Sequence, residues 1–307
     1  MLSSLLALAC SQKSEQPIEG TPPMESPPVV ETFTPKFAAL IKGPKSPEGV
    51  QAILGTPDIG VGVYRVGFVL TSADGFVTAP EANVTLIRYA STIPAGEPRE
   101  TVKATFYPWP YGKRGIYTAE LQFDSPGSWG LNISTEVSDG TTRTAQLRFE
   151  VPDTPLAPDV GAQALRSINK TVADVESIAQ LTTGSIRDPD LYQTTITEAV
   201  SNDLPTVLVF ASPAFCTNEV CGPQLEVLQQ LKDKYKGRAN FIHVDFYDNP
   251  HEIQGNLDKA ILSPVVVEWK LSSIEWSFVI APNGTITARF ESFVSFDEIE
   301  QALLKQI

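Results

Sequence analysis

Hydrophobic and polar positions alternate along the first half of the chain. The alternation is clear at residues 64–70, 117–123 and 145–151, where every second side chain is apolar. A period of two is typical of half-buried antiparallel strands. Turn-forming residues such as those at 73–75 and 138–140 separate the alternating segments. Between residues 37 and 151 the pattern therefore predicts about seven short antiparallel strands.

This number of strands over a stretch of domain size resembles an immunoglobulin-like β-sandwich, which we expect over residues 36–152. The stretch has no cysteine pair, so the resemblance is one of architecture only. An aromatic run at 106–111 either packs over one end of the sandwich or forms a binding loop. We favour packing, because aromatic side chains usually serve it.

The second half of the chain has a different pattern, with continuous apolar runs followed by helical spacing. Runs at 206–210 and 240–245 are typical of strands buried on both faces of a sheet. Leucines at helical spacing then predict a helix that ends near Lys236. Two further strands are expected at 276–280 and 285–290, and a closing helix starts at Ser295 with Glu298 as its capping-box partner. Residues 185–307 thus predict a mixed sheet flanked by helices.

The remaining segments connect or precede these parts. Residues 153–184 form a linker and packing segment that begins among three prolines. Residues 1–10 resemble the signal peptide and lipobox of a bacterial lipoprotein, with Cys10 as the lipidated residue. Residues 11–35 are rich in Ser, Glu and Pro and predict a disordered tether. We therefore expect a protein outside the cytoplasm that a lipid on Cys10 attaches to the cell membrane.

Composition narrows the function classes. The 307 residues are 42% hydrophobic, which is enough for two domains of ordinary size. A net charge of −13 argues against a nucleic-acid-binding surface, which needs a basic face. No apolar run approaches the roughly 20 residues of a membrane-spanning helix. The three cysteines make one lipidation site and one pair.

That pair, Cys216 and Cys221, is the candidate functional site. Both thiols lie in a loop between a buried strand and a helix, where the helix N-terminus favours thiolate over thiol. The pattern is compatible with redox-active thiols, with a structural disulfide, or with a metal site. Thiolates suit Cu(I), and a third ligand would be His243 or His251. We favour a packed neutral imidazole for His243, because it lies on a buried strand.

The order of strand, cysteine loop, helix and later strands resembles the thioredoxin-like superfamily over about 120 residues. This resemblance implies an α/β fold and thiol–disulfide exchange with the thiols or disulfides of exported proteins. Cys216 would then be the nucleophile and Cys221 the resolving thiol, although the roles could be reversed. The chain departs from the family, because four residues separate the cysteines and Glu275 stands where the family has a cis-proline. The wider spacing is closer to copper-delivering proteins of cytochrome-oxidase assembly. The alternative is therefore a non-enzymatic copper-handling or binding module.

Overall fold

The computed structural model describes residues 40–90, 93–110, 112–215 and 223–307. All of them belong to one compact unit, residues 33–307. The first sheet contains β1 (Gln51–Leu54), β2 (Gly62–Ser72), β3 (Gly75–Phe76), β4 (Glu81–Ala90), β5 (Ile93–Pro108), β6 (Gly115–Phe123), β7 (Gly127–Glu136) and β8 (Thr142–Val151). The second sheet contains β9 (Thr206–Ala211), β10 (Asn240–Asp245), β11 (Trp276–Ile280) and β12 (Ile286–Glu291). The α-helices are α1 (Ile196–Ala199), α2 (Gln224–Tyr235), α3 (Pro250–Ile253), α4 (Pro264–Glu268) and α5 (Phe296–Leu304), and the 3-10 helices are η1 (Ile178–Gln180), η2 (Pro189–Tyr192) and η3 (Leu257–Lys259).

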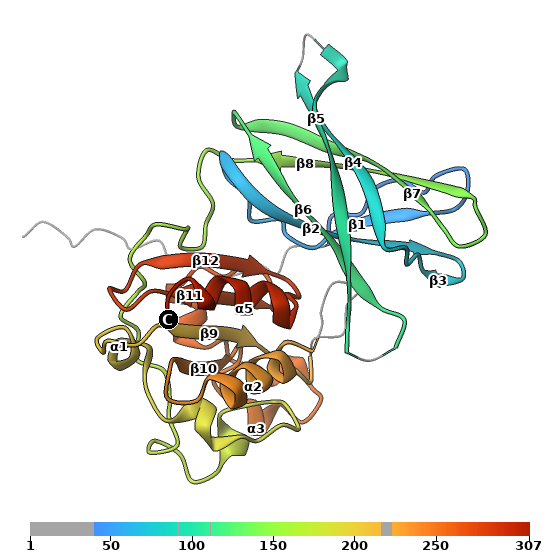
Figure 1. Cartoon of the computed structure of the whole chain (residues 1–307). Helices are drawn as coiled ribbons and strands as arrows, with labels where there is room; N and C mark the ends of the chain where they lie inside the picture. The colour runs from blue at the N-terminus through green and yellow to red at the C-terminus, as the bar shows by residue number, and fades with distance from the viewer. Residues whose placement is uncertain (1–39, 91–92, 111, 216–222) are drawn as a thin grey trace, which may run out of the picture. The chain divides into compact units, whose positions relative to one another are not determined.

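The first sheet is a single antiparallel sheet that approaches a closed barrel (Figure 1). Its strand order is β1-β2-β6-β5-β4-β7-β8, with β3 paired to β2. The segment before β1 reaches β8, where a Cβ on Gly43 would come within 1.7 Å of the Gln146 carbonyl oxygen. Thr144 on β8 also donates to Glu48 over 3.2 Å. The interior is filled by large buried side chains, including Phe68, Tyr117, Phe123 and Trp129.

The immunoglobulin-like sandwich expected for residues 36–152 is therefore wrong, although its strands are confirmed. The alternating segments at 64–70, 117–123 and 145–151 lie in β2, β6 and β8. A sandwich consists of two separate sheets packed face to face. Here hydrogen-bonded pairing continues without interruption from β1 to β8. Alternation determines which side chains point inward, but it does not determine how strands that are far apart in sequence pair.

The second sheet is mixed and buried on both faces. Its order is β10-β9-β11-β12, with β9 parallel to β10 and with β11 antiparallel to β9 and β12. Successive residues of β9 belong to two different apolar clusters, since Val207 and Val209 pack on one face while Leu208 and Phe210 pack on the other. This double burial explains why the sequence of β9 is an uninterrupted apolar run.

The elements predicted for residues 185–307 are found, but their classification was wrong. The four predicted strands agree with β9 to β12, and Ser295 and Glu298 form the predicted capping box of α5. Strands hold far more of the described residues than helices do, so the fold is mostly β rather than an α/β thioredoxin-like domain. Helices α1, α3 and α4 have only 4, 4 and 5 residues. They are too short for the helical layers of an α/β architecture.

The aromatic run at 106–111 serves packing where the structure describes it. Trp109 is buried, and its ring lies 6.0 Å from that of Phe76 and 6.3 Å from that of Phe293. The ring of Phe106 lies 4.9 Å from that of Tyr117 in the barrel. Trp109 thus links the barrel to the segment that follows β12. Tyr111 lies outside the described residues.

Candidate functional site

The predicted cysteine loop starts at the carboxyl end of β9. Cys216 and Cys221 lie in the segment 216–222, which is outside the described residues. On either side of it, β9 ends at Ala211 and α2 begins at Gln224, so the predicted order of strand, loop and helix is confirmed. No disulfide is found in the described part of the chain, which contains none of the three cysteines.

A hydrogen-bonded group holds the start of this loop, and we call it the stem network. It consists of Thr183, Ser212 and Asp245. The carboxylate of Asp245 accepts from the Thr183 backbone N–H over 2.7 Å and from its hydroxyl over 2.9 Å. The Thr183 hydroxyl lies 3.1 Å from that of Ser212 and accepts from the Ala214 N–H over 3.3 Å. The network therefore ties the residues just before Cys216 to the end of β10.

The carboxyl group of Asp245 is buried at the edge of the second sheet, with 4% of the residue exposed. Burial raises its pKa to about 6, and hydrogen bonds from the backbone N–H groups of Thr183 and Tyr247 oppose that rise. Above this pH an ionised carboxylate accepts the donors of the stem network. Asp245 therefore positions the start of the loop, and its carboxylate accepts hydrogen bonds from Thr183 and Tyr247.

His243, one of the two candidate histidine ligands, is buried in the second sheet, and both of its ring nitrogens are hydrogen-bonded there. It is 1% exposed, and its Nε2 lies 3.1 Å from the Ala211 carbonyl oxygen while its Nδ1 lies 2.8 Å from the Tyr192 hydroxyl. A carbonyl only accepts, so Nε2 carries the proton and Nδ1 accepts from Tyr192. Burial lowers the pKa of His243 to about 4. The packed neutral imidazole favoured from the sequence is thus confirmed.

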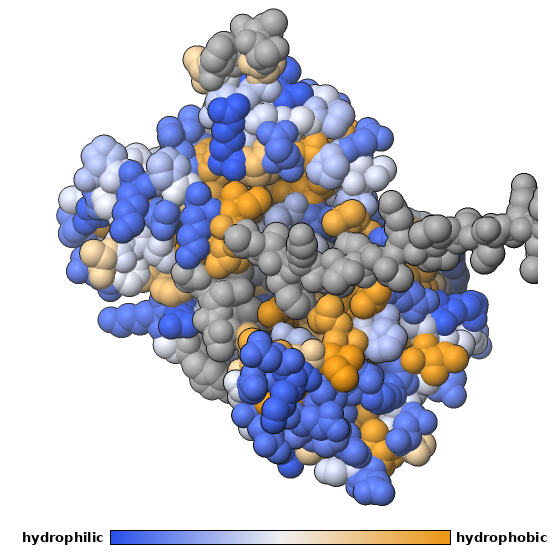
Figure 2. Space-filling model, turned by 180° about the vertical axis from the view of Figure 1, so that it is seen from behind, coloured by the Kyte–Doolittle hydropathy of each residue, from blue (hydrophilic) through white to orange (hydrophobic). Residues whose placement is uncertain are grey.

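A cavity of about 280 Å³ lies beside the stem network. Its lining includes His243 and Asp245 together with Lys170, whose ammonium lies 2.8 Å from the Asp248 carboxylate. Ile168 also lines it and is 82% exposed, which gives the cavity an apolar lip. On the face of the molecule drawn in Figure 2, exposed hydrophobic residues form several separate areas with hydrophilic residues between them. The buried side-chain atoms without a hydrogen-bond partner among the described residues include none from this lining.

The described residues contain no group of three or more His, Cys, Asp or Glu side chains that could hold a metal ion. His251, the second candidate histidine, lies on α3 with 38% of its side chain exposed, and its Nε2 is 3.8 Å from Glu252. The structure thus brings neither histidine together with other ligands in the described part of the chain.

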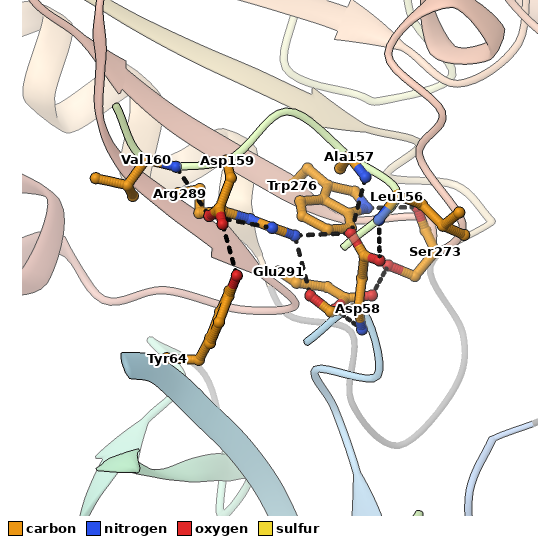
Figure 3. Close-up of polar contacts among 10 residues, drawn as sticks. All are labelled: Asp58, Tyr64, Leu156, Ala157, Asp159, Val160, Ser273, Trp276, Arg289 and Glu291. Carbon is orange, nitrogen blue, oxygen red and sulfur yellow. Dashed lines mark hydrogen bonds and ion pairs between the residues drawn. The ribbon is translucent and has the colours of Figure 1, made fainter. Parts of the chain in front are cut away.

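A second polar site lies where the barrel meets the second sheet (Figure 3). We call it the junction cluster, and it consists of Asp58, Asp159, Ser273, Arg289 and Glu291. Arg289 on β12 donates to the Asp58 carboxylate over 2.8 Å and lies 3.5 Å from that of Asp159. The backbone N–H groups at 156 and 157 also donate to Asp58, over 2.8 and 3.0 Å. Three donors therefore compensate the buried charge of Asp58.

Glu291 is the deepest carboxyl of the junction cluster, and 5% of the residue is exposed. It accepts from the Asp58 N–H over 2.8 Å, and its other carboxyl oxygen is hydrogen-bonded to the Ser273 hydroxyl over 2.7 Å. Burial raises its pKa to about 8 and the charge of Asp58 adds to the rise, while Ser273 and Arg289 act against it. At neutral pH Glu291 is therefore mainly the neutral acid.

The sequence interpretation missed both polar sites. Asp58 is separated from Arg289 by 231 residues and from Glu291 by 233. One local signal existed, because Glu291 directly follows the predicted strand 285–290 and is soon followed by the apolar residues Phe293 and Val294. Thr183 fell in the predicted linker, where nothing in the pattern pointed to a role.

The predicted lipid-attachment site also lies outside the described residues. Cys10 and the segments 1–10 and 11–35 belong to this part, so location outside the cytoplasm stays a prediction. Within the described part, no helix combines the length and apolar character needed to cross a bilayer. Neither the described residues nor the comparisons below support a lipoprotein or a signal peptide, and that classification is withdrawn.

The comparisons with known proteins do not assign this chain to a family. No family model matches the chain, and no curated protein matches it. Three chains of known structure match. One is the crystal structure of the PmoD soluble domain from Methylocystis sp. ATCC 49242 (Rockwell), with 15% identity and a TM-score of 0.22. The match covers 36% of this chain and 97% of that one. A TM-score this low supports no conclusion about fold or function, and the resemblance to the thioredoxin-like superfamily receives no support.

Proposed function

We propose that the protein is a non-enzymatic binding module that carries Cu(I) on the thiolates of Cys216 and Cys221. Cysteine thiolates are soft ligands, and soft ligands select Cu(I) over the hard cations. The two thiols are only five positions apart in the sequence, so one loop can bring both to a single ion.

The observation that supports this proposal most directly is that the imidazole of His243 is already hydrogen-bonded on both sides. Both of its ring nitrogens already have hydrogen-bond partners inside the sheet. Adding His243 to a metal would therefore break two buried hydrogen bonds and leave Tyr192 and Ala211 without their partner. The thiols then remain as a two-donor site. Cu(I) accepts two thiolates, whereas structural zinc is almost always held by four ligands.

The stem network supports the same function. It holds the hydroxyl of Ser212 and the backbone N–H of Ala214, so the loop starts from a defined position at the end of β9. The anchoring uses side chains that donate and accept internally. Thiol–disulfide exchange, the other function considered from the sequence, is not supported by the described residues or by the comparisons, and we do not retain it.

Titration of the reduced, full-length protein with Cu(I), against a competing Cu(I) chelator and without oxygen, tests the proposal. We expect one equivalent of Cu(I) per chain and weaker retention of Zn²⁺. The variant with Cys216→Ser and Cys221→Ser should lose the bound copper, and His251→Ala serves as the matched control that keeps it. Failure of the reduced protein to bind Cu(I), or binding that survives in the double serine variant, would refute the proposal.

A further inference from the structure

The junction cluster joins elements that are far apart in the sequence through buried, charged groups. Asp58 comes from the loop between β1 and β2, Asp159 from the segment after β8, and Arg289 and Glu291 from β12. Arg289 is the cation of the cluster, and its guanidinium serves both Asp58 and Asp159. With Glu291 neutral the cluster carries a net charge of −1, by the sum of two carboxylates and one guanidinium. Ionisation of Glu291 would make it −2.

We propose that Glu291 is a protonation-dependent latch that holds the Asp58 loop of the barrel on β12 and releases it as the pH rises. The neutral carboxylic acid of Glu291 is compatible with both of the hydrogen bonds that its oxygens make. One oxygen accepts from the Asp58 N–H, and the other lies 2.7 Å from the Ser273 hydroxyl, which can accept the acid proton. All polar atoms of the neutral side chain are then satisfied, as burial requires.

Burial and the charge of Asp58 disfavour the ionised form, and they outweigh the opposing effects of Ser273, the Asp58 N–H and Arg289. The Asp58 carboxylate faces it from the barrel loop and Asp159 lies across Arg289. Tyr64 on β2 already donates its hydroxyl to Asp159. Glu275, buried in the loop before β11, accepts from the Ser292 N–H through its backbone carbonyl.

The guanidinium of Arg289 lies among these groups but is not free to move to Glu291. It donates to the backbone carbonyl and the carboxylate of Asp58, and it lies 5.0 Å from the ring of Trp276. Its rotation toward Glu291 would remove the main cationic partner of Asp58 in a site where an unpaired charge is costly. Release of the Asp58 loop instead moves the Asp58 carboxylate away from Glu291 into water and leaves the Arg289 guanidinium beside the ionised Glu291.

A neighbouring contact limits how far the release extends. Arg65 on β2 donates to the Glu298 carboxylate over 2.7 Å and to the Phe293 carbonyl oxygen over 2.9 Å. This contact also joins the barrel to the segment after β12, and it does not include Glu291. The latch therefore acts on the Asp58 loop and leaves the barrel attached through Arg65.

Hydrogen exchange at the Asp58 amide measures the latch directly, because this N–H donates to Glu291. We expect its protection, normalised to intrinsic exchange in the full-length protein, to fall about tenfold between pH ~7 and pH ~9. The amide of Val209 in the middle of β9 exchanges only through wider unfolding, so it should remain better protected than the Asp58 amide at both pH values. The Glu291→Gln variant, which keeps the shape of the neutral acid, should show constant protection at Asp58.

Glu150→Gln is the matched control, since Glu150 is exposed on β8. This variant should show the same fall as the wild-type protein. Equal protection of the wild-type Asp58 amide at both pH values would overturn the proposal. So would a fall that persists in Glu291→Gln, since it would place the pH dependence elsewhere, or protection at Asp58 equal to that at Val209, since it would show that the loop does not open locally.

Discussion

The backbone N–H of Asp58 donates to the buried carboxyl of Glu291 over 2.8 Å, across 233 residues of sequence. This hydrogen bond joins the barrel to the second sheet. Beside it, Arg289 pairs with the carboxylate of the same aspartate over 2.8 Å. One loop residue of the barrel therefore uses both its backbone and its side chain to dock on β12.

Stability should depend on pH through Glu291. Its pKa is raised from an ordinary value of 4.5 to about 8, so the folded protein binds the proton more tightly than the unfolded chain. The contribution to stability is complete below pH ~4.5, is lost as the pH rises toward ~8, and is constant above that. Glu291→Gln should remove this loss, so the variant should be more stable than the wild type at pH ~8.5 by up to a few kcal/mol.

Urea unfolding of both proteins at several pH values measures this difference. The gap between Glu291→Gln and the wild type should widen between pH ~5 and ~8 and then stay level. A gap that is constant over the whole range would show that Glu291 is already ionised in the folded protein.

Arg289→Met should be strongly destabilising, because it leaves the Asp58 carboxylate buried without its cation. The side chains of Arg289 and Asp58 are 6% and 4% exposed. Loss of one partner of a buried pair costs about 3–5 kcal/mol. Lys103→Met is the matched control, since Lys103 and its partner Glu81 are 68% and 54% exposed. We expect it to cost less than about 1 kcal/mol in the same denaturant titration. Similar costs for the two variants would contradict the role given to Arg289.

The elements of this fold could be read from the sequence because they depend on local patterns. The double burial of β9 produced a continuous apolar run, and the capping box at Ser295 and Glu298 marked the start of α5. The architecture depends instead on which strands pair. The near closure of the barrel needs Gly43 against Gln146, a contact between residues about a hundred positions apart. Periodicity holds no information on such a contact, and the sandwich and thioredoxin-like assignments failed for this reason.

The candidate site was only partly visible for a similar reason. The sequence marked the two cysteines as a chemical motif, and it correctly favoured packing for His243. It could not show that Thr183, within a predicted linker, would return to bond Asp245, because 62 residues separate them. Long-range polar contacts of this kind leave no local trace.

Thr183→Ala should loosen the start of the cysteine loop. The change removes the hydroxyl that donates to Asp245 and accepts from the Ala214 N–H. Loss of two such hydrogen bonds should cost about 1–3 kcal/mol and speed hydrogen exchange at Ala214. Thr142→Ala, at an exposed position on β8, is the control that should change neither. Unchanged exchange at Ala214 in Thr183→Ala would show that the stem network does not hold the loop.

Tyr192→Phe should destabilise the protein without affecting copper binding. The change removes the hydroxyl that lies 2.8 Å from Nδ1 of His243 and leaves that buried acceptor unsatisfied. The expected cost is about 1–3 kcal/mol in urea unfolding. Tyr89→Phe, at a half-buried position on β4, provides a comparison. A loss of Cu(I) affinity in Tyr192→Phe, beyond the loss of folded protein, would connect His243 to the metal and contradict the thiol-only site.

The coordination of bound copper tests the central claim most directly. X-ray absorption at the copper edge of the fully reduced protein, loaded with one equivalent of Cu(I), reports the atoms around the ion. We predict a shell of two sulfur atoms, from Cys216 and Cys221, without nitrogen or oxygen, because His243 keeps both of its hydrogen bonds. A shell that contains an imidazole nitrogen, or a protein that holds no copper, would contradict the account.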